Sequence, residues 1–194
     1  MDTIDWNRSF PGAENAAFTE DKGILLDFFN PDSVVCQQMD RDTYSHKKVK
    51  AFIAEHLQPY RADNPDEPYF ERYNIIWTPT LVFLDKLGRE NHRSVGYLGP
   101  ADFFATGMLA LGKIYSSNGN FAAAQYHFDK VLKDYPHSLI AEETLFYIGV
   151  TRYRQTKNPV EFKKVARILQ KDYPTGSWTR KAEPYLIVTE SQTL

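Results

Sequence analysis

The sequence predicts an α/β domain with a mixed central sheet flanked by helices, followed by an all-α helical array. Three observations favour this division of the 194-residue chain. Helix-like and strand-like hydrophobic patterns alternate over residues 1–106, whereas residues 107–194 have a helical pattern almost throughout. The second stretch also contains an internal repeat. Formal charge changes sign between them: residues 1–106 carry 17 acidic and 11 basic side chains, and residues 107–194 carry 8 and 12. We therefore expect two domains with these bounds.

The composition is that of an ordinary globular protein, with 42% hydrophobic and 25% charged residues. No run of 18 apolar residues exists, so we expect no membrane span. The first residues lack the basic and apolar regions of a secretory signal, which predicts a cytoplasmic location. Cysteine occurs once, as Cys36, so the chain cannot close an intramolecular disulfide.

Short apolar runs bounded by turn residues define the elements of the first domain. Residues 23–29 form an apolar run interrupted only by Asp27 and ending at Asn30-Pro31, which is typical of a buried central strand. Residues 33–57 carry apolar side chains at spacings of three and four, which predicts a helix, with a break or bend near residues 42–45. The other elements expected are a helix at 13–21, strands at 58–62, 80–84 and 93–97, a helical turn or two at 66–73, and a turn at 85–88.

The helical pattern of the second domain repeats with an offset of 38 residues. Residues 115–136 and 153–174 coincide at six of 22 positions, and both end in Lys-Asp-Tyr-Pro. Small and large residues recur in the first copy, and the proline ends its second helix; small residues let paired helices approach and aromatics fill the gap between them. These positions are Leu111, Gly112, Tyr115, Gly119, Ala124, Phe128 and Pro136. This stretch resembles a tetratricopeptide repeat. We expect a second, more degenerate copy at about 143–176 and a last helix at 177–188 that covers the open end of the stack.

The first domain carries residues whose order matches a known superfamily. Trp6 and a short helix are followed by Leu26-Asp27-Phe28-Phe29, Cys36, Trp77-Thr78-Pro79-Thr80-Leu81-Val82-Phe83 and Gly96-Tyr97. In these residues the stretch 6–106 resembles the thioredoxin-like superfamily. The resemblance implies that fold, a cis peptide bond at Thr78-Pro79, and pairing of an extended client segment with the backbone beside this proline.

One helix has to serve both domains. The thioredoxin-like fold needs a terminal helix and the repeat needs a first helix, yet only one helix fits between Gly99-Pro100 and Gly119. We predict a single continuous or barely kinked helix at about 101–117, with Gly107 as the expected kink. The two domains would then be rigidly coupled.

The redox motif of the superfamily is altered in this chain. The resemblance implies Cys-x-x-Cys at the start of a helix, with the first cysteine as nucleophile and the second as resolving thiol. The matching residues here are Ser33-Val34-Val35-Cys36. A serine hydroxyl supplies no thiolate, so it cannot attack a disulfide. The substitution therefore predicts that dithiol activity is lost.

Two interpretations remain open for each residue of this motif. Cys36 is either a buried small hydrophobe, as free cysteines commonly are, or a monothiol that forms mixed disulfides. Ser33 either caps the helix or holds the thiol of a bound glutathione, as serine does in some glutathione transferases of the superfamily. Asp27 matches the acid that shuttles a proton in redox-active relatives. Without the first cysteine it is either an inherited buried acid, whose pKa burial should raise, or a partner of some neighbour.

We therefore predict a non-redox protein-binding module, an adaptor or chaperone-like factor, coupled to a tetratricopeptide-like interaction array. The alternative is a monothiol oxidoreductase or glutathione-binding enzyme acting in redox homeostasis. The catalytic candidates for that alternative are Cys36, Ser33 and Asp27, and the expected binding residues are Ser33, Val34, Val35, Trp77, Thr78 and Pro79. Tyr69, Phe70, Tyr73 and Trp77 are expected to line a surface near the proline loop.

The expected partner is a protein or peptide. The five histidines show no metal-ligand spacing and no phosphate or dinucleotide motif is present, so we expect no metal and no cofactor. No stacking aromatics are interleaved with the basic residues of the second domain, so we expect no nucleic-acid partner. The sequence does not indicate an oligomeric state.

Overall fold

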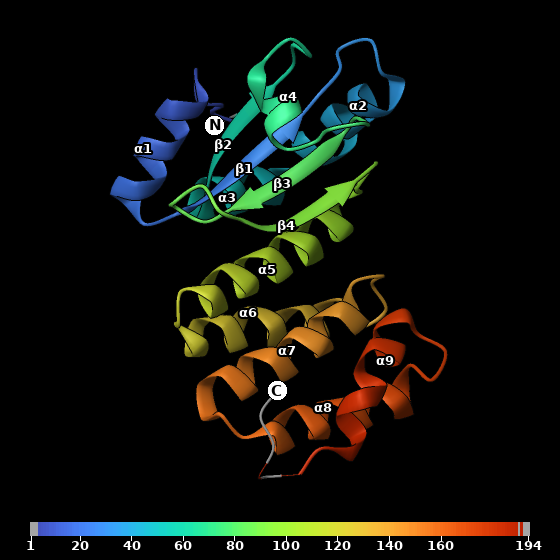
Figure 1. Cartoon of the computed structure of the whole chain (residues 1–194). Coiled ribbons are helices and arrows are strands. Elements are labelled where there is room, and N and C mark those ends of the chain that lie inside the picture. Colours follow the sequence, from blue (N-terminus) through green and yellow to red (C-terminus); the bar gives the residue numbers. More distant parts are fainter. Residues whose placement is uncertain (1–3, 190, 192–194) are drawn as a thin grey trace. The chain divides into compact units, whose positions relative to one another are not determined.

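The computed structural model describes residues 4–189 and 191, and the chain forms two compact units, 1–110 and 111–194 (Figure 1). The boundary falls inside helix α5 (Pro100–Ser117), so the single helix predicted at about 101–117 is confirmed. A Cβ atom on Gly107 would lie 2.6 Å from Cε1 of Phe52, so this glycine allows the helix to pack closely against that ring. The domain boundary between 106 and 107 and the rigid coupling of the two domains stay predictions.

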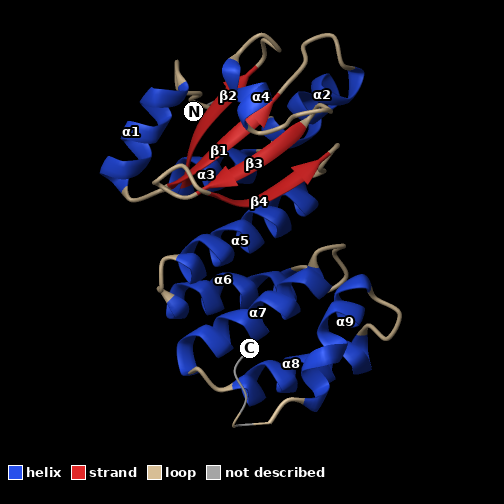
Figure 2. Ribbon diagram, in the orientation of Figure 1, coloured by secondary structure: helices blue, strands red, loops and turns tan. Residues whose placement is uncertain are grey.

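The first unit is built on a four-stranded mixed sheet with the order β2-β1-β3-β4 (Figure 2). Strand β1 (Gly23–Phe28) pairs in parallel with β2 (Leu57–Ala62) and antiparallel with β3 (Thr80–Leu84). Strand β4 (Glu90–Val95) pairs antiparallel with β3 at one edge. Every side chain of β1 is buried, as expected for a strand covered on both faces.

Alternate residues of the central strands face two separate layers of helices. Ile24, Leu26 and Phe28 of β1 pack with α1 (Phe10–Glu20) and, through the half-buried Phe70, with α4 (Pro68–Arg72). On the opposite face, Asp27 of β1 pairs with Arg61 of β2, which also pairs with Asp40, the residue after helix α2 (Val34–Met39). A π-helix (Asp40–Tyr44) and α3 (Lys47–His56) continue from α2.

Several predicted bounds shift for local reasons. Helix α1 begins at Phe10 rather than at residue 13, because the Ser9 hydroxyl accepts a hydrogen bond from the Gly12 N–H and Pro11 is tolerated in the first turn. Strand β4 covers 90–95 instead of 93–97, because Gly96 takes a positive φ of 94° and leaves the sheet. The bend expected near 42–45 is the π-helix.

The second unit consists of helices that pack against one another in antiparallel pairs (Figure 2), as the repeat predicts. After the end of α5 come α6 (Phe121–Asp134), α7 (Ala141–Thr156), α8 (Pro159–Asp172), α9 (Ser177–Ala182) and a 3₁₀-helix (Glu183–Ile187). A Cβ atom on Gly112 would lie 2.3 Å from Phe128, and one on Gly149 would lie 3.1 Å from Phe162. Each helix pair thus uses a glycine to admit an aromatic ring.

None of the helices within residues 4–189 is both long enough and apolar enough to span a membrane.

Candidate functional site

The sheet topology brings four loops to one end of the first unit. Strands β1 and β2 are parallel and both end at this edge, where Phe28 pairs with Ala62. Strand β3 starts opposite Phe28 and β4 ends opposite Thr80. We call the connecting segments 29–33, 63–67, 74–79 and 96–99 the carboxyl-end loops. The expected binding residues Ser33, Trp77, Thr78 and Pro79 all belong to them.

Ser33 is the N-cap of helix α2, as one interpretation of the sequence predicts. Its Oγ accepts a hydrogen bond of 3.4 Å from the backbone N–H of Cys36, and its own N–H donates to the carbonyl of Asn30. The Asn30 side chain accepts from the N–H of Asp32 at 2.9 Å, which fixes the turn before the helix. The hydroxyl that replaces the nucleophilic thiol therefore has a structural partner.

Cys36 is fully buried, one turn into the helix. The only hydrogen bond to its Sγ within the described residues comes from the backbone N–H of Asn30, at 3.5 Å. A thiol enclosed in this way is poorly accessible to a disulfide or an alkylating reagent. This geometry favours the interpretation of Cys36 as a small buried hydrophobe.

The peptide bond between Thr78 and Pro79 is cis, as the resemblance implies. The carbonyl of Pro79 accepts from the N–H of Gly96, and the Thr80 hydroxyl donates to the carbonyl of Trp77, so the loop is tied to β4 and to the start of β3. In the part of the chain that the structure describes, the backbone of Thr78 makes no hydrogen bond. Its amide and carbonyl can therefore pair with an added segment.

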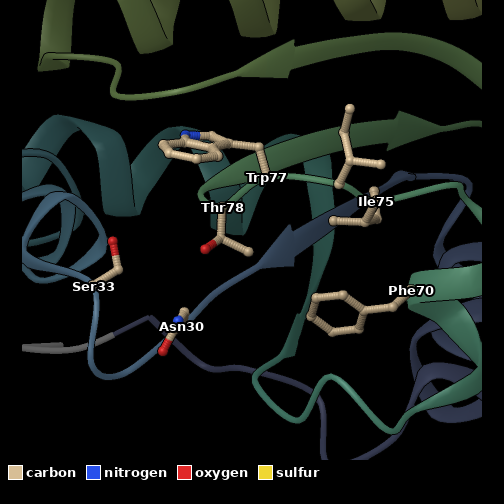
Figure 3. Close-up of a pocket in the computed structure, with 7 residues that line it drawn as sticks. Asn30, Ser33, Phe70, Ile75, Trp77 and Thr78 are labelled. Atoms are coloured by element: carbon tan, nitrogen blue, oxygen red, sulfur yellow. The ribbon is translucent and has the colours of Figure 1, made fainter.

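A cavity of about 360 Å³ lies between this loop and the start of α2 (Figure 3). Figure 3 places Asn30, Ser33 and Thr78 around one end of it and Phe70 toward the other. The full lining is Asn30, Ser33, Phe70, Ile75, Ile76, Trp77 and Thr78. An apolar wall with a few hydroxyl and amide groups suits one side chain of a polypeptide better than a charged cofactor.

Apolar side chains that are unusually exposed surround this cavity. Trp77 is 63% exposed, Ile76 89% and Val34 71%, and Val35 and Val95 are exposed as well. A cluster of this kind on a globular domain is typical of an interaction surface. The structure brings Ser33, Trp77 and Thr78 together in the cavity, whereas Val34, Val35 and Pro79 do not line it.

Two parts of the expected aromatic surface belong to the core instead. Tyr73 is buried and Tyr69 packs against the same hydrophobic cluster under α1, with the Tyr69 ring 4.8 Å from that of Phe10. Of the four aromatics expected at the surface, only Phe70 and Trp77 reach the cavity. Sequence reasoning missed Asn30, Ile75 and Ile76. The apolar pair Ile75-Ile76 beside Trp77 was the available signal.

Behind the motif helix, Asp27 is fully buried and paired with Arg61. Their strands are in register, and the Arg61 Nε and Nη2 atoms lie 2.9 and 2.8 Å from Oδ2 of Asp27. The same guanidinium donates to both oxygens of Asp40, at 3.2 and 2.7 Å. Burial raises the pKa of Asp27 to about 6, and the positive charge of Arg61 opposes this shift.

Aromatic rings enclose the Arg61 guanidinium on its remaining sides. Its carbon lies 4.4 Å from the ring centre of Trp6, 4.1 Å from that of Phe29 and 5.3 Å from that of Tyr44. An acid that exchanges protons with a thiol must lie within hydrogen-bond reach of it, directly or through one water. Asp27 is instead fixed by a bidentate partner, which fits the interpretation of an inherited buried acid bonded to a neighbour.

Within the described residues no cluster of three or more His, Cys, Asp or Glu side chains has the geometry to hold a metal ion. A second cavity, of about 480 Å³, lies at the other end of the sheet between α3 and the start of β2. None of the candidate site residues lines it.

A mixed sheet with a cis-proline loop facing the start of a helix defines a thioredoxin-fold protein, here with Ser-x-x-Cys at the motif. Residues 10–108, just over half of the chain, match the model of the thioredoxin-like domain, so the chain belongs to the thioredoxin-like family. Residues 107–138 match the model of the tetratricopeptide repeat, so a repeat of this family directly follows the first domain.

Individual relatives are distant. The chain is 26% identical over 161 residues to an acetaldehyde dehydrogenase of Pseudomonas aeruginosa, covering 82% of this chain and 30% of that protein. It is 29% identical over 105 residues to a thiol:disulfide interchange protein DsbD of Ralstonia nicotianae, covering 52% of this chain and 17% of the relative. The chain thus spans less than a third of either curated relative.

Among solved structures, a thioredoxin from Thermus thermophilus has the same fold. The match has a TM-score of 0.54 at 24% identity and covers 60% of this chain and 93% of the thioredoxin. At this identity the likeness shows the fold alone.

Proposed function

We propose that this protein binds other polypeptides without thiol chemistry, as an adaptor or chaperone-like factor. The observation that carries the proposal is the state of the two motif residues. Ser33 caps helix α2 and Cys36 is fully buried beneath it, while the surface around them stays open and apolar. This arrangement supports binding, and a fully buried Cys36 argues against disulfide exchange at this motif.

The geometry beside the cis-proline supports an extended client. The Thr78 backbone has an amide and a carbonyl to offer, and a segment that pairs with them would pass over Trp77 and the cavity. Main-chain hydrogen bonds would supply affinity for any extended segment, and the cavity would select one side chain. The exposed Val34 at the start of α2 would add an apolar contact.

The helical unit supports the same kind of function, because tetratricopeptide repeats commonly mediate protein interactions. The ammonium of Lys113 pairs with Glu143 and lies 4.0 Å from the ring centre of Tyr147. This contact joins α7 to the end of α5. We propose that the surface formed by these helices is a second site for a protein partner.

Thiol chemistry is the alternative, and the name of the Ralstonia relative is what favours it. That relative is a thiol:disulfide interchange protein, but the match covers 17% of its length. The buried position of Cys36 argues against a mixed disulfide at this thiol. We do not assign dehydrogenase activity to this chain, because the match covers only 30% of the Pseudomonas acetaldehyde dehydrogenase.

A permanently unfolded polypeptide whose cysteines carry a neutral blocking group, such as carboxamidomethylated ribonuclease A, tests the proposal, since it cannot form a mixed disulfide. The full chain should bind it, Trp77→Ala should weaken binding by about tenfold, and Cys36→Ala should bind as the native chain does. Trp178→Phe, in the second unit, controls for loss of a tryptophan elsewhere. An absence of binding, or equal binding by Trp77→Ala, would overturn the proposal.

A further inference from the structure

The carboxyl-end loops are acidic and contain no basic residue. Their four charged side chains are Asp32, Asp63, Asp66 and Glu67. Asp32, Asp63 and Asp66 are exposed, and in the described part of the chain none of the three has an ion-pair partner. Glu67 is half-buried and accepts a hydrogen bond from Tyr60. Four carboxylates therefore lie in loops at the same end of the sheet as Trp77.

These carboxylates lie close to the surface that we assign to client binding. Asp32 directly precedes Ser33, which lines the cavity. The loop with Asp63 and Asp66 follows β2, which is separated from β3 only by β1, so it starts about 10 Å from the cis-proline loop. The same loop leads into α4, whose Phe70 lines the cavity.

The nearest buried cation does not cancel this charge. Arg61 lies behind the motif helix, where Asp27 and Asp40 both pair with it. These three groups together carry no positive charge. The amide groups at the start of α2 are partly satisfied by the Ser33 cap. Within the carboxyl-end loops themselves, no Lys or Arg offsets the four carboxylates.

We propose that the partner segment is basic as well as apolar: an extended stretch of polypeptide with an aliphatic or aromatic side chain flanked by Lys or Arg. The inference rests on the proposed function, since it names the chemistry of the client at the same site. The apolar residue enters the cavity beside Phe70 and Trp77. The flanking ammonium or guanidinium groups lie over Asp32 on one side and over Asp63 and Asp66 on the other.

The physical effect is one of steering and selection. Exposed carboxylates each contribute little to affinity, but several of one sign attract a basic segment and repel an acidic one. At about 0.1 M salt the Debye length of about 10 Å still reaches from these loops to a segment bound at Trp77. Higher salt should therefore remove most of the preference.

The test uses the full chain and three dye-labelled peptides that share one extended apolar core. Their flanks carry two Lys, two Gln or two Glu residues, and binding is followed by fluorescence anisotropy at low and high salt. We expect the Lys peptide to bind about tenfold more tightly than the Glu peptide at low salt, with the Gln peptide between them and the preference shrinking at high salt.

A pair of double variants assigns the preference to the loops. Asp63→Asn with Asp66→Asn should reduce the Lys-over-Glu ratio at least about threefold while leaving Gln-peptide binding unchanged. Glu20→Gln with Glu55→Gln removes the same charge from the opposite end of the sheet, and this control should keep the ratio. Both native pairs are exposed, so neither variant should disturb folding.

The two proposals fail in different ways. Equal binding of all three peptides would contradict the proposal that the partner is basic, and so would a preference that the Asp63/Asp66 variant does not change. Neither result would contradict the proposal that the protein binds polypeptides. Tighter binding of the Glu peptide than of the Lys peptide would likewise contradict the proposal of a basic partner. An absence of binding by every peptide would contradict the proposed function, and the inference would fall with it.

Discussion

Arg61 and Asp27 lie opposite each other on adjacent parallel strands, with the Arg61 Nε atom 2.9 Å from Oδ2 of the carboxylate. The same guanidinium holds Asp40 of the π-helix and is covered by the ring of Trp6. One side chain thus ties together the N-terminal segment, the sheet and the helix that carries the altered motif. Asp27, which the resemblance matches to the proton-shuttling acid of redox-active relatives, is thus part of this ion-pair network.

Arg61→Lys should destabilise the first unit clearly. An ammonium cannot bridge both Asp27 and Asp40 or stack on Trp6 as the planar guanidinium does, so a buried carboxylate loses part of its compensation. We expect a loss of about 2 to 4 kcal/mol in the free energy of unfolding, measured by urea denaturation. Arg93→Lys, at a more exposed pair with Glu90, should cost less than about 1 kcal/mol. Equal losses at the two positions would contradict a special role for Arg61.

The free energy of unfolding should change with pH as Asp27 titrates. Its pKa is raised from 3.8 to about 6, first by burial, with Arg61 opposing. The folded state therefore holds this proton more tightly than the unfolded state. The resulting stabilisation is complete below about pH 4 and is lost as pH rises through 6.

Asp27→Asn removes this titration. The native chain should lose about 3 kcal/mol of stability relative to Asp27→Asn between pH 4 and 7, since each pH unit of the difference corresponds to about 1.4 kcal/mol. Urea unfolding of both chains across this range measures the difference. A constant difference from pH 4 to 7 would show that Asp27 does not titrate in this way.

The glycines of the two helix pairs should differ in their tolerance of alanine. A Cβ atom at Gly112 would lie 2.3 Å from the ring of Phe128, whereas one at Gly149 would lie 3.1 Å from that of Phe162. Gly112→Ala should destabilise the second unit by about 1 to 3 kcal/mol through overpacking. Gly149→Ala should cost less, because a small shift of the ring relieves the contact. Thermal unfolding of the two variants provides the comparison, and a larger loss at Gly149 would refute it.

Local patterns were sufficient to predict most of the fold. The apolar run at 23–29 gave β1 to within one residue, and the residues around Thr78-Pro79, through the resemblance, led to the cis peptide bond. The bend in the long helix followed from its mixed apolar spacing. A helix cap was one of the two interpretations of Ser33, and the cap is present. In each case the determining residues lie close together in the chain.

Contacts between distant segments were not predictable in the same way. Asp27 and Arg61 are 34 residues apart, and only the β1–β2 register makes them neighbours. Asp40, the first residue of the π-helix, joins them through the Arg61 guanidinium, and helical periodicity does not indicate the extra residue of a π-turn. Asn30 and Ile75 reach the cavity through loop conformations that neither helix nor strand patterns encode.

The aromatic surface shows the same limit. Residues 69–77 are rich in aromatic and apolar side chains, and the sequence does not tell which of them face inward. Tyr73 turns into the core under α1, whereas Trp77, four residues later, lies exposed after a turn that includes the positive φ of Asn74. The left-handed Asn74 lies between them, and a pattern of apolar residues does not indicate such a turn.

The most direct test of the central claim is the rate at which Cys36 reacts with an alkylating reagent in the native chain between pH 6 and 9. Ser33→Cys in a Cys36→Ala background serves as the positive control, because its single thiol would lie half-exposed at a helix start and could not close a disulfide. If binding has replaced thiol chemistry, native Cys36 should react at least about a hundredfold more slowly than in the urea-unfolded chain. Labelling as fast as that of Ser33→Cys, with a midpoint below about pH 7, would instead show a working monothiol and contradict the account.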